Sequence, residues 1–279
     1  MSRPTIVVVG SLNVDLTLRC DRLPQPGETV TGRDFTQRPG GKGANQALAA
    51  ARLGANVSMV GRTGADAYAE VALSNLRAAG VDLRRVTEVD LPTGIAMILV
   101  DGAGENAIAV HSGANAQLDL GDVDLSGADA VICQLESPGA AVVQAARATR
   151  GLFCLNAAPA VPVPPEALAR ADLVIVNETE YAALPATNAV VALTLGEAGA
   201  VLLKDGEQLA RAKAPAVTAV DTVGAGDTFV AAFVVGLLEG RPPGDALQRA
   251  CLAAALTVTH EGAQTAMPTN TELDDWIAA

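Results

Sequence analysis

Two aspartates and two glycines lie together in DTVGAGDTF (221–229), just ahead of an apolar run of helical length. Glycine disfavours a helix, but Gly224 and Gly226 would let backbone amides converge where this helix begins. Unpaired N–H groups and the helix dipole favour an anion there, such as a phosphoryl group with developing negative charge. Asp227, in the first turn, faces the same place and could accept a proton from an attacking hydroxyl. The alternative is that Asp227 only stabilises the helix N-terminus, but that role needs neither glycine.

A second glycine-rich segment, RPGGKGANQALAAARLG (38–54), leads into a strong helical pattern. Its glycines would bring backbone N–H groups close to a ligand. The segment lacks the spacing of a Walker A loop, however. A tight turn that leaves Lys42 and Asn45 on the surface is therefore an equal alternative.

A pair of polar side chains follows the first strand. GSLNVDLTL (10–18) puts Asn13 and Asp15 two residues apart in an extended stretch, so both point to one face. Their position beyond the carboxyl end of a parallel strand suits a polyhydroxylated ligand. A solvated strand end is the alternative.

Three more polar segments follow buried strands. QLESP places Glu136, and NETE places Asn177 and Glu180, at the carboxyl ends of parallel strands, where open α/β sheets bind ligands. Asn177 and Glu180 also have the spacing of a helix capping box, and the two roles are compatible. TLGEAG (194–199) either lets a nucleotide lie against the backbone or turns the chain into the next strand.

Composition and periodicity predict an α/β protein. Half of the 279 residues are apolar and only seven are aromatic (one Trp, two Tyr, four Phe), so Ala, Val, Leu and Ile must form the core. Short Val/Ile-rich runs alternate with Ala-rich helical stretches, which indicates a doubly wound, mostly parallel sheet covered on both faces. The strands are expected at 6–10, 56–61, 130–133, 152–156, 173–177 and 190–196. The helices are expected at 43–53, 66–79, 139–149, 178–184, 225–239 and 244–259, with a hairpin over 200–211.

Residues 1–279 are expected to form one domain with an inserted sheet. The alternating segments at about 12–38 and 94–112 do not fit the α/β rhythm and read as a small antiparallel sheet. Such a sheet would be a lid over a cleft, or an edge that pairs with another subunit.

Charge and cysteine usage exclude several classes of partner. The net charge of −12 argues against nucleic acid and against an anionic membrane. No apolar stretch approaches transmembrane length, and no signal peptide is recognised. The four cysteines show no metal-ligand spacing and are expected to be small buried hydrophobes in a reducing, cytoplasmic compartment.

Taken together, these segments resemble the PfkB-type sugar kinases, and most closely the ribokinase branch of that family. The resemblance runs from GSLNVD to EGAQTAMP (261–268) and is carried by PGETVTG, GGKGANQA, GENAIAVHSGAN, QLESP, NAAPA, NETE, TLGEAG and DTVGAGDTF. It implies a ribokinase-like fold, a homodimer through the lid sheet, and ATP-dependent phosphorylation of D-ribose at O5. It also implies Mg²⁺ and possible K⁺ as cofactors.

The resemblance implies a role for each matched residue. Asp227 would be the base, and the amides of Gly224, Ala225 and Gly226 would be the anion hole. Ribose hydroxyls would contact Asp227 and a set of polar or glycine residues: Asn13, Asp15, Gly41, Lys42, Asn45 and Glu136. The nucleotide would lie at Asn177, Thr194, Gly196 and Gly199, with Glu180 organising Mg²⁺ through water. The monovalent-cation site would comprise Asp221, Val223, Thr257, His260 and Gly262.

Three positions depart from the family's pattern, and other functions stay open. Residues 185–189 replace a helix and a longer connection, Ala266 stands where a Ser usually contacts K⁺, and Cys251 stands where a His often lies beside adenine. The alternatives are a kinase for deoxyribose, another sugar or a nucleoside, and a non-catalytic sugar-binding relative. A dehydrogenase is disfavoured because no GxGxxG follows the first strand.

Overall fold

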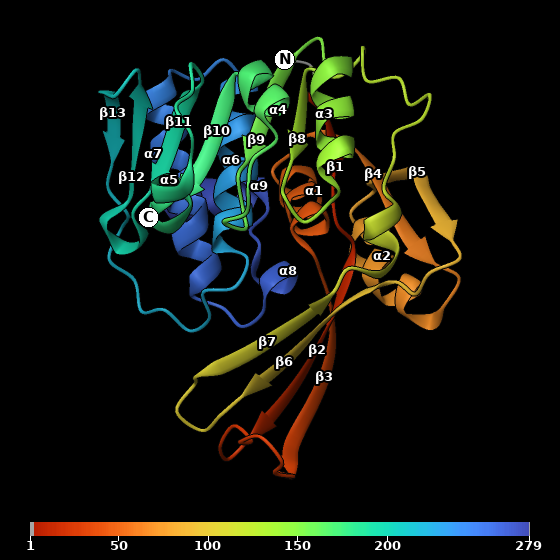
Figure 1. Ribbon diagram of the computed structural model, residues 1–279. Coiled ribbons are helices and arrows are strands. Elements are labelled where there is room, and N and C mark those ends of the chain that lie inside the picture. The colour runs from red at the N-terminus through yellow and green to blue at the C-terminus, as the bar shows by residue number, and fades with distance from the viewer. Residues whose placement is uncertain (1–2, 279) are drawn as a thin grey trace.

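A large twisted sheet forms the centre of the protein, which the computed structural model describes over residues 3–278. Within that range its nine strands run in the order β13-β12-β11-β10-β9-β8-β1-β4-β5 (Figure 1). All neighbours pair in parallel except β11–β12 and β12–β13, and the second of these pairs is the predicted hairpin. The bounds are β1 (Thr5–Val9), β4 (Asn56–Gly64), β5 (Asp82–Val89), β8 (Ala130–Cys133), β9 (Leu152–Asn156), β10 (Leu173–Asn177), β11 (Val190–Thr194), β12 (Ala200–Lys204) and β13 (Glu207–Ala212).

Helices cover both faces of this sheet, which confirms the predicted doubly wound α/β fold. Ile6 and Val8 of β1 pack into one core, whereas Val7 and Val9 pack into the other. The first core lies under α1 (Lys42–Arg52), α2 (Ala67–Ala78), α6 (Ala225–Leu238) and α7 (Pro243–Val258). The second lies under α3 (Gly139–Ala148) and α4 (Pro165–Arg170), beside α5 (Glu178–Ala183). The remaining helical segments are η1 (Gly113–Gln117), η2 (Gly196–Ala198), α8 (Ala263–Ala266) and α9 (Asn270–Ala278). None of the helices over residues 3–278 is long and apolar enough to cross a membrane.

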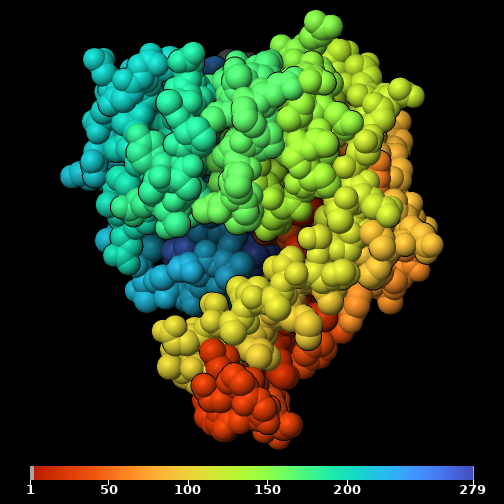
Figure 2. Space-filling model, viewed as in Figure 1, coloured from red at the N-terminus to blue at the C-terminus, as the bar shows by residue number. Residues whose placement is uncertain are grey.

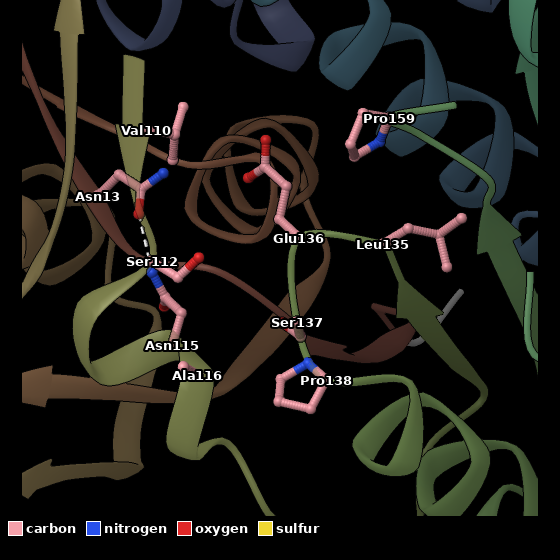
Figure 3. A pocket seen from close by; sticks show the side chains of 10 residues that line it. All are labelled: Asn13, Val110, Ser112, Asn115, Ala116, Leu135, Glu136, Ser137, Pro138 and Pro159. Carbon is pink, nitrogen blue, oxygen red and sulfur yellow. Dashed lines mark hydrogen bonds between the residues drawn. The ribbon is translucent and has the colours of Figure 1, made fainter. Parts of the chain in front are cut away.

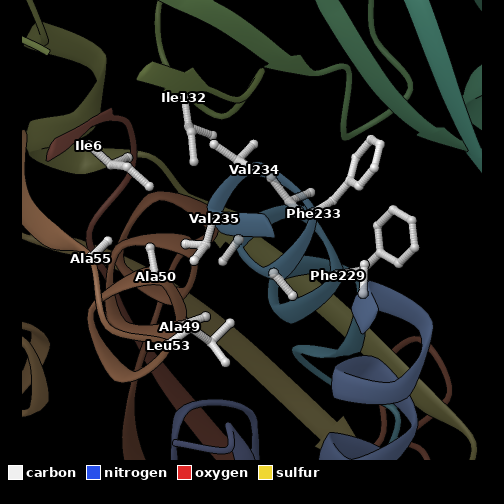
Figure 4. Close-up of a cluster of buried hydrophobic side chains, with 14 of the residues drawn as sticks. Ile6, Ala49, Ala50, Leu53, Ala55, Ile132, Phe229, Phe233, Val234 and Val235 are labelled. Atoms are coloured by element: carbon white, nitrogen blue, oxygen red, sulfur yellow. The ribbon is translucent and has the colours of Figure 1, made fainter. Parts of the chain in front are cut away.

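The packing of α1 against α6 brings two distant parts of the chain together. Alanines such as Ala49 and Ala50 on α1 leave room for larger side chains of α6, such as Val235 (Figure 4). Small residues at a helix contact allow a short interaxial distance. The first turns of the two helices therefore lie side by side.

A small sheet projects from the main body (Figure 1). It contains β2 (Asn13–Cys20), β3 (Gly32–Gly40), β6 (Gly94–Val100) and β7 (Asn106–His111) in the order β3-β2-β6-β7. The space-filling view shows a hollow between this sheet and the body (Figure 2). The outer pairings are antiparallel as expected, but β2 and β6 pair in parallel because the chain passes through β4, α2 and β5 between them.

The two faces of the small sheet differ in their side chains. Asp15, Ala96 and Val110 are cross-strand partners, so they share one face, which we call the inner face. Phe35 and Met97 are paired with β2 residues of opposite parity and lie on the other, outer face. The inner face carries the polar pair predicted after the first strand.

Candidate active site

The order in which strands are added to the sheet reverses between β1 and β8, which is a topological switch point. Strand β1 continues toward β4 and β5 on one side, and β8 continues toward β9 to β11 on the other. Open α/β sheets bind ligands at such a switch point. A cavity of about 440 Å³ lies there, and Figure 3 shows Asn13 and Val110 on one side of it and Glu136 on the other.

Asn13 is held at the rim of this cavity by Asn115 of η1. The Nδ2 of Asn115 donates to Asn13 Oδ1 over 2.8 Å, and the same side chain binds the backbone N–H and carbonyl of Leu12. Because the Asn13 oxygen is already occupied, its N–H₂ group is the part directed at a ligand. Asn115 lies in HSGAN, but its role could not be assigned without the tertiary contact.

Glu136 and Ser11 close the N-terminus of α1. The Oε2 of Glu136 accepts from Ser11 Oγ over 2.6 Å and from the Lys42 N–H over 3.0 Å. Gly41 has a φ of 91°, and a Cβ there would lie 2.9 Å from the Asn13 nitrogen and from the Ser11 carbonyl oxygen. The glycine is therefore required for the close approach between α1 and the segment after β1.

Several charged groups lie near Glu136, which lines the cavity. Burial, Glu136 and Asp227 together raise the pKa of Asp15 from 3.8 to about 6. Burial lowers the pKa of Lys42, but the carboxylates of Asp227, Glu136 and Glu180 outweigh it, so the pKa of Lys42 lies above its usual value. The Lys42 ammonium thus lies near three carboxylates that come from separate parts of the chain.

Replacing Asp15 with Asn is expected to stabilise the fold at neutral pH. The raised pKa means that the native state binds the Asp15 proton more tightly than the unfolded chain, so stability falls as pH rises from about 4 to about 6. Removing the charge should increase the free energy of unfolding by about 1–2 kcal/mol after screening by solvent. Thermal melts of both proteins across this pH range measure the effect. A neutral-pH Tm no higher than that of the parent would contradict it, and Asp34→Asn, exposed in the same sheet, is the control.

Asp227 is the most deeply buried carboxylate of the cluster. It lies in the first turn of α6, with only 7% of its surface exposed. Its Oδ1 accepts from Gln46 over 2.9 Å and its Oδ2 from Asn45 over 2.8 Å. Burial raises the pKa of Asp227 above its usual value, while Lys42 and the two amides pull it down. The carboxylate is thus both oriented and suited to accepting a proton.

The N-terminus of α6 offers free N–H groups beside this carboxylate. Gly224 is the N-cap in a left-handed conformation (φ 82°), and no side chain in residues 3–278 caps this end. The N–H of Ala225 lies 3.4 Å from the Thr222 carbonyl, a long contact. Gly226 is exposed, and a Cβ there would meet nothing within 4 Å. Space for an anion is therefore open directly in front of the helix dipole.

The residues predicted to contact a nucleotide lie at the ends of β10 and β11. Asn177 and Thr194 are cross-strand partners, which places NETE beside TLGEAG. Asn177 and Glu180 form a reciprocal capping box, with distances of 2.8 and 2.9 Å, so the capping interpretation is confirmed. Gly196 and Gly199 both have positive φ and bracket the 3₁₀ turn of η2.

The residues predicted to hold a monovalent cation meet where the segment before α6 lies against the segment after α7. Asp221 accepts from the Val223 N–H over 3.0 Å and from the Gly262 N–H over 2.9 Å. The Thr257 carbonyl accepts from the His260 N–H, which turns the chain at the end of α7. These bonds involve all five predicted residues, in two groups: Asp221 with Val223 and Gly262, and Thr257 with His260. Ala266 is buried close by in α8, with no polar atom to offer.

The shortened connection is accommodated without loss of the strand pairing. After α5 the chain returns through 184–189 directly to β11, which pairs in parallel with β10 as predicted. A second cavity of about 440 Å³ opens beside the connection, lined in part by Tyr181, Leu184 and Leu203. All four cysteines are buried and unpaired, as expected from their spacing.

Fold and site together define an α/β enzyme that transfers a group to a small polar molecule. The model of the pfkB family carbohydrate kinases matches residues 3–270. The chain therefore belongs to the pfkB family of carbohydrate kinases, which are phosphotransferases acting on a hydroxyl group of a sugar.

Curated relatives and solved structures agree with this family over the full length. The ribokinase of Bacillus subtilis is 39% identical over 294 residues, which is 98% of this chain and 99% of that protein. The ribokinase of Schizosaccharomyces pombe is 36% identical over 306 residues, 96% of each chain. The ribokinase of Thermotoga maritima superimposes with a TM-score of 0.90 at 32% identity, covering 99% of this chain and all of that one. The Arabidopsis thaliana ribokinase complexed with ribose and ATP gives 0.89 at 32% identity over the whole of both chains.

Proposed function

We propose that this protein catalyses the ATP-dependent phosphorylation of D-ribose at O5, giving D-ribose 5-phosphate. The observation that carries the proposal is the buried carboxylate of Asp227, placed in the uncapped first turn of α6 and near both Lys42 and Glu136, of which Glu136 lines the cavity. Ribokinases from several organisms are similar to this chain over nearly its whole length, which supports the choice of sugar and nucleotide.

The site residues then divide into two groups. Asn13, Asp15 and Glu136 would bind sugar hydroxyls, together with Lys42 and the backbone around Gly41. Asp227 would accept the proton of the O5 hydroxyl as its oxygen attacks the γ-phosphoryl group. The first-turn N–H groups at Gly224, Ala225 and Gly226 would stabilise the charge on the transferring phosphoryl group.

The nucleotide side of the reaction is assigned to the ends of β10 and β11. Thr194, Gly196 and Gly199 would lie along ATP. Bound Mg²⁺ would neutralise phosphate charge, and the exposed oxygens of Asn177 and Glu180 fit its preference for oxygen ligands through water. The carboxylate of Asp221 and the carbonyls of Val223, Thr257, His260 and Gly262 supply only oxygen atoms, which suits K⁺.

A coupled ADP-release assay over a panel of sugars and nucleosides, with and without K⁺, tests the assignment. We expect the highest kcat/KM with D-ribose. Turnover of a different sugar with ribose inactive would replace the substrate, and ribose binding by calorimetry with no ADP release would identify a non-catalytic sugar-binding protein.

One feature of the small sheet argues against a nucleoside as the acceptor. Among the strands of the small sheet, Phe35 is the Phe, Tyr or Trp residue on whose ring a base could stack. It lies on the outer face, away from Asn13 and Asp15. A base would have no aromatic ring of this sheet on which to stack. The polar side chains of Asn13 and Asp15 suit a free sugar better.

We also infer that the small sheet is a lid whose outer face binds a second copy of this chain. Phe35 and Met97 are each 57% exposed there, beside Leu16 and Leu18. A four-stranded sheet that projects into solvent with an apolar face is stabilised when another surface covers it.

The buried, unpaired cysteines are consistent with a reducing, cytoplasmic compartment.

Replacing Met97 with Asp is expected to convert the homodimer into a monomer. A carboxylate in the middle of the apolar outer face cannot be desolvated without a partner charge. Sedimentation equilibrium or light scattering measures the mass directly. Leu209→Asp, on the edge strand β13 and also 57% exposed, is the matched control and should leave the mass unchanged. A dimer that survives Met97→Asp and Phe35→Asp would contradict the assignment of this face.

A further inference from the structure

A chain of buried amides ends on one oxygen of the Asp227 carboxylate. Gln134 Nε2 donates to Gln46 Oε1 over 2.6 Å, and Gln46 Nε2 donates to Asp227 Oδ1 over 2.9 Å. The same Gln46 nitrogen donates to Asn156 Oδ1, also over 2.9 Å, and Asn156 Nδ2 donates to the Ile175 carbonyl over 3.0 Å. The amides come from α1 and from the ends of β8 and β9, and Gln46 is completely buried.

A second chain ends on the other oxygen. Asn75 Nδ2 donates to Gln264 Oε1 over 3.1 Å, and Gln264 Nε2 donates to Asn45 Oδ1 over 3.0 Å. Asn45 Nδ2 then donates to Asp227 Oδ2 over 2.8 Å. Each oxygen of the carboxylate therefore accepts a hydrogen bond from an amide of α1 that is itself hydrogen-bonded.

The direction of the first chain is determined by the backbone. The Ile175 carbonyl can only accept, so Asn156 must turn its N–H₂ group toward it and its oxygen toward Gln46. Gln46 must in turn present its nitrogen to Asn156 and Asp227, and its oxygen to Gln134. Rotating the Gln46 amide by half a turn would set its oxygen against two other oxygens.

The network also retains a contact that stability alone would not favour. The Oε1 of Gln134 is buried without a hydrogen-bond partner, and it lies where a Cβ on Gly10 would be. An unpaired buried acceptor costs about 1–3 kcal/mol, and an apolar side chain of similar volume would avoid that cost. Gln134 does, however, supply the donor that fixes the oxygen of Gln46.

We propose that Gln46 is a positioning residue for the phosphoryl-transfer reaction, which holds the Asp227 carboxylate in one orientation and in its charged form. Gln134 and Asn156 act through Gln46 by fixing which end of its amide faces Asp227. The proposal rests on the role proposed above for Asp227 as the base. Gln46 and Asp227 are 181 residues apart in the sequence. The segment GGKGANQA would therefore position the catalytic base as well as bind the sugar.

Gln46→Met keeps the side-chain length but removes the donor. We expect kcat to fall roughly tenfold to a hundredfold, because the Asp227 carboxylate would be free to rotate. The KM for ATP should stay unchanged. The acid limb of the kcat/KM profile should move to higher pH, because a lost donor destabilises the charged form. Gln46→Glu, which sets a second carboxylate against the first, should move the limb further in the same direction.

Two comparisons separate this role from packing. Thr149→Val removes a buried hydrogen bond to Ala145 far from the cavity, and it should lower Tm without moving the acid limb. In an Asp227→Asn background, Gln46→Met should cause no additional loss of kcat, because its effect passes through the carboxylate. If Gln46→Met does not fold, Gln134→Met decides, with a smaller loss and a limb shift of the same sign.

The kinetics of these variants distinguish a positioning role of Gln46 from a packing role and from a wrong assignment of the base. An unchanged kcat and an unchanged acid limb in Gln46→Met, with Asp227→Asn inactive, would overturn the positioning role and leave the base intact. Near-normal turnover of Asp227→Asn would instead remove the proposed base. Equal additional losses in the parent and in the Asp227→Asn background would show that Gln46 acts on packing.

Discussion

Asp227→Asn is expected to lower kcat by about 10²–10⁴-fold while sugar binding is retained. The substitution preserves shape but removes the lone pair and charge that would accept the O5 proton. Burial already raises the pKa of Asp227, so the native site holds a carboxylate with unusual affinity for a proton. ADP release in the coupled assay gives kcat, and calorimetry with ribose gives binding independently of turnover.

A matched control exists in the next helix. Asp245 also lies in a first turn, that of α7, but it is exposed and does not affect the pKa of Asp15, Lys42 or Asp227. Each of the two variants removes one carboxylate from the first turn of a helix, but only Asp227 is placed to act as a base. Asp245→Asn should therefore leave kcat unchanged. A folded Asp227→Asn enzyme that turns over ribose at a near-normal rate would end the assignment.

Strand and helix positions were predictable where local pattern and tertiary environment agree. Strands β8, β9 and β10 were expected at the residues where they occur, because strands buried on both faces must be continuously apolar. Strand β5, DLRRVTEV, was missed. It lies at the edge of the sheet beside β4 only, where charged side chains remain in solvent.

The parallel pairing of β2 with β6 has a different cause. β2 alternates polar and apolar residues, whereas β6 is apolar throughout, and neither pattern carries information on direction. The direction is determined by where β4, α2 and β5 return the chain. The alternation thus identified the small sheet, but not its internal order.

The candidate site shows the same division. Asp227, Glu136 and Asn13 could be selected because each follows a strand or opens a helix at the ligand-binding edge. The amides behind them could not. Gln46, like many buried glutamines, gives no local signal, and its contacts with Asn156 and Asp227 join residues 110 and 181 positions apart.

Gly226→Val is expected to lower kcat by roughly 10²–10³-fold and to leave the fold intact. The amide groups at the N-terminus of α6 can stabilise a phosphoryl group only if its oxygens reach them, and losses of this size follow when one such donor is removed. A Cβ on Gly226 would meet no atom of another segment of residues 3–278 within 4 Å, so the new side chain enters open space at the helix end where the phosphate is proposed to bind. Gly226→Ala should give a smaller loss in the same direction.

The neighbouring glycines show why Gly226 is the informative position. Gly224 has a φ of 82°, and a Cβ there would lie 2.9 Å from the Ala263 Cα, so its replacement would distort the backbone as well as the anion site. Gly244, in the first turn of α7, would meet only an ordinary contact at 3.8 Å, which makes Gly244→Ala the control for Gly226→Ala. If Gly226→Val keeps the parent's kcat and KM for ATP, the phosphoryl group does not pass through this space. A loss of kcat with an unchanged Tm, absent in Gly244→Ala, would place the transferring phosphate at the start of α6, beside the carboxylate that activates its acceptor.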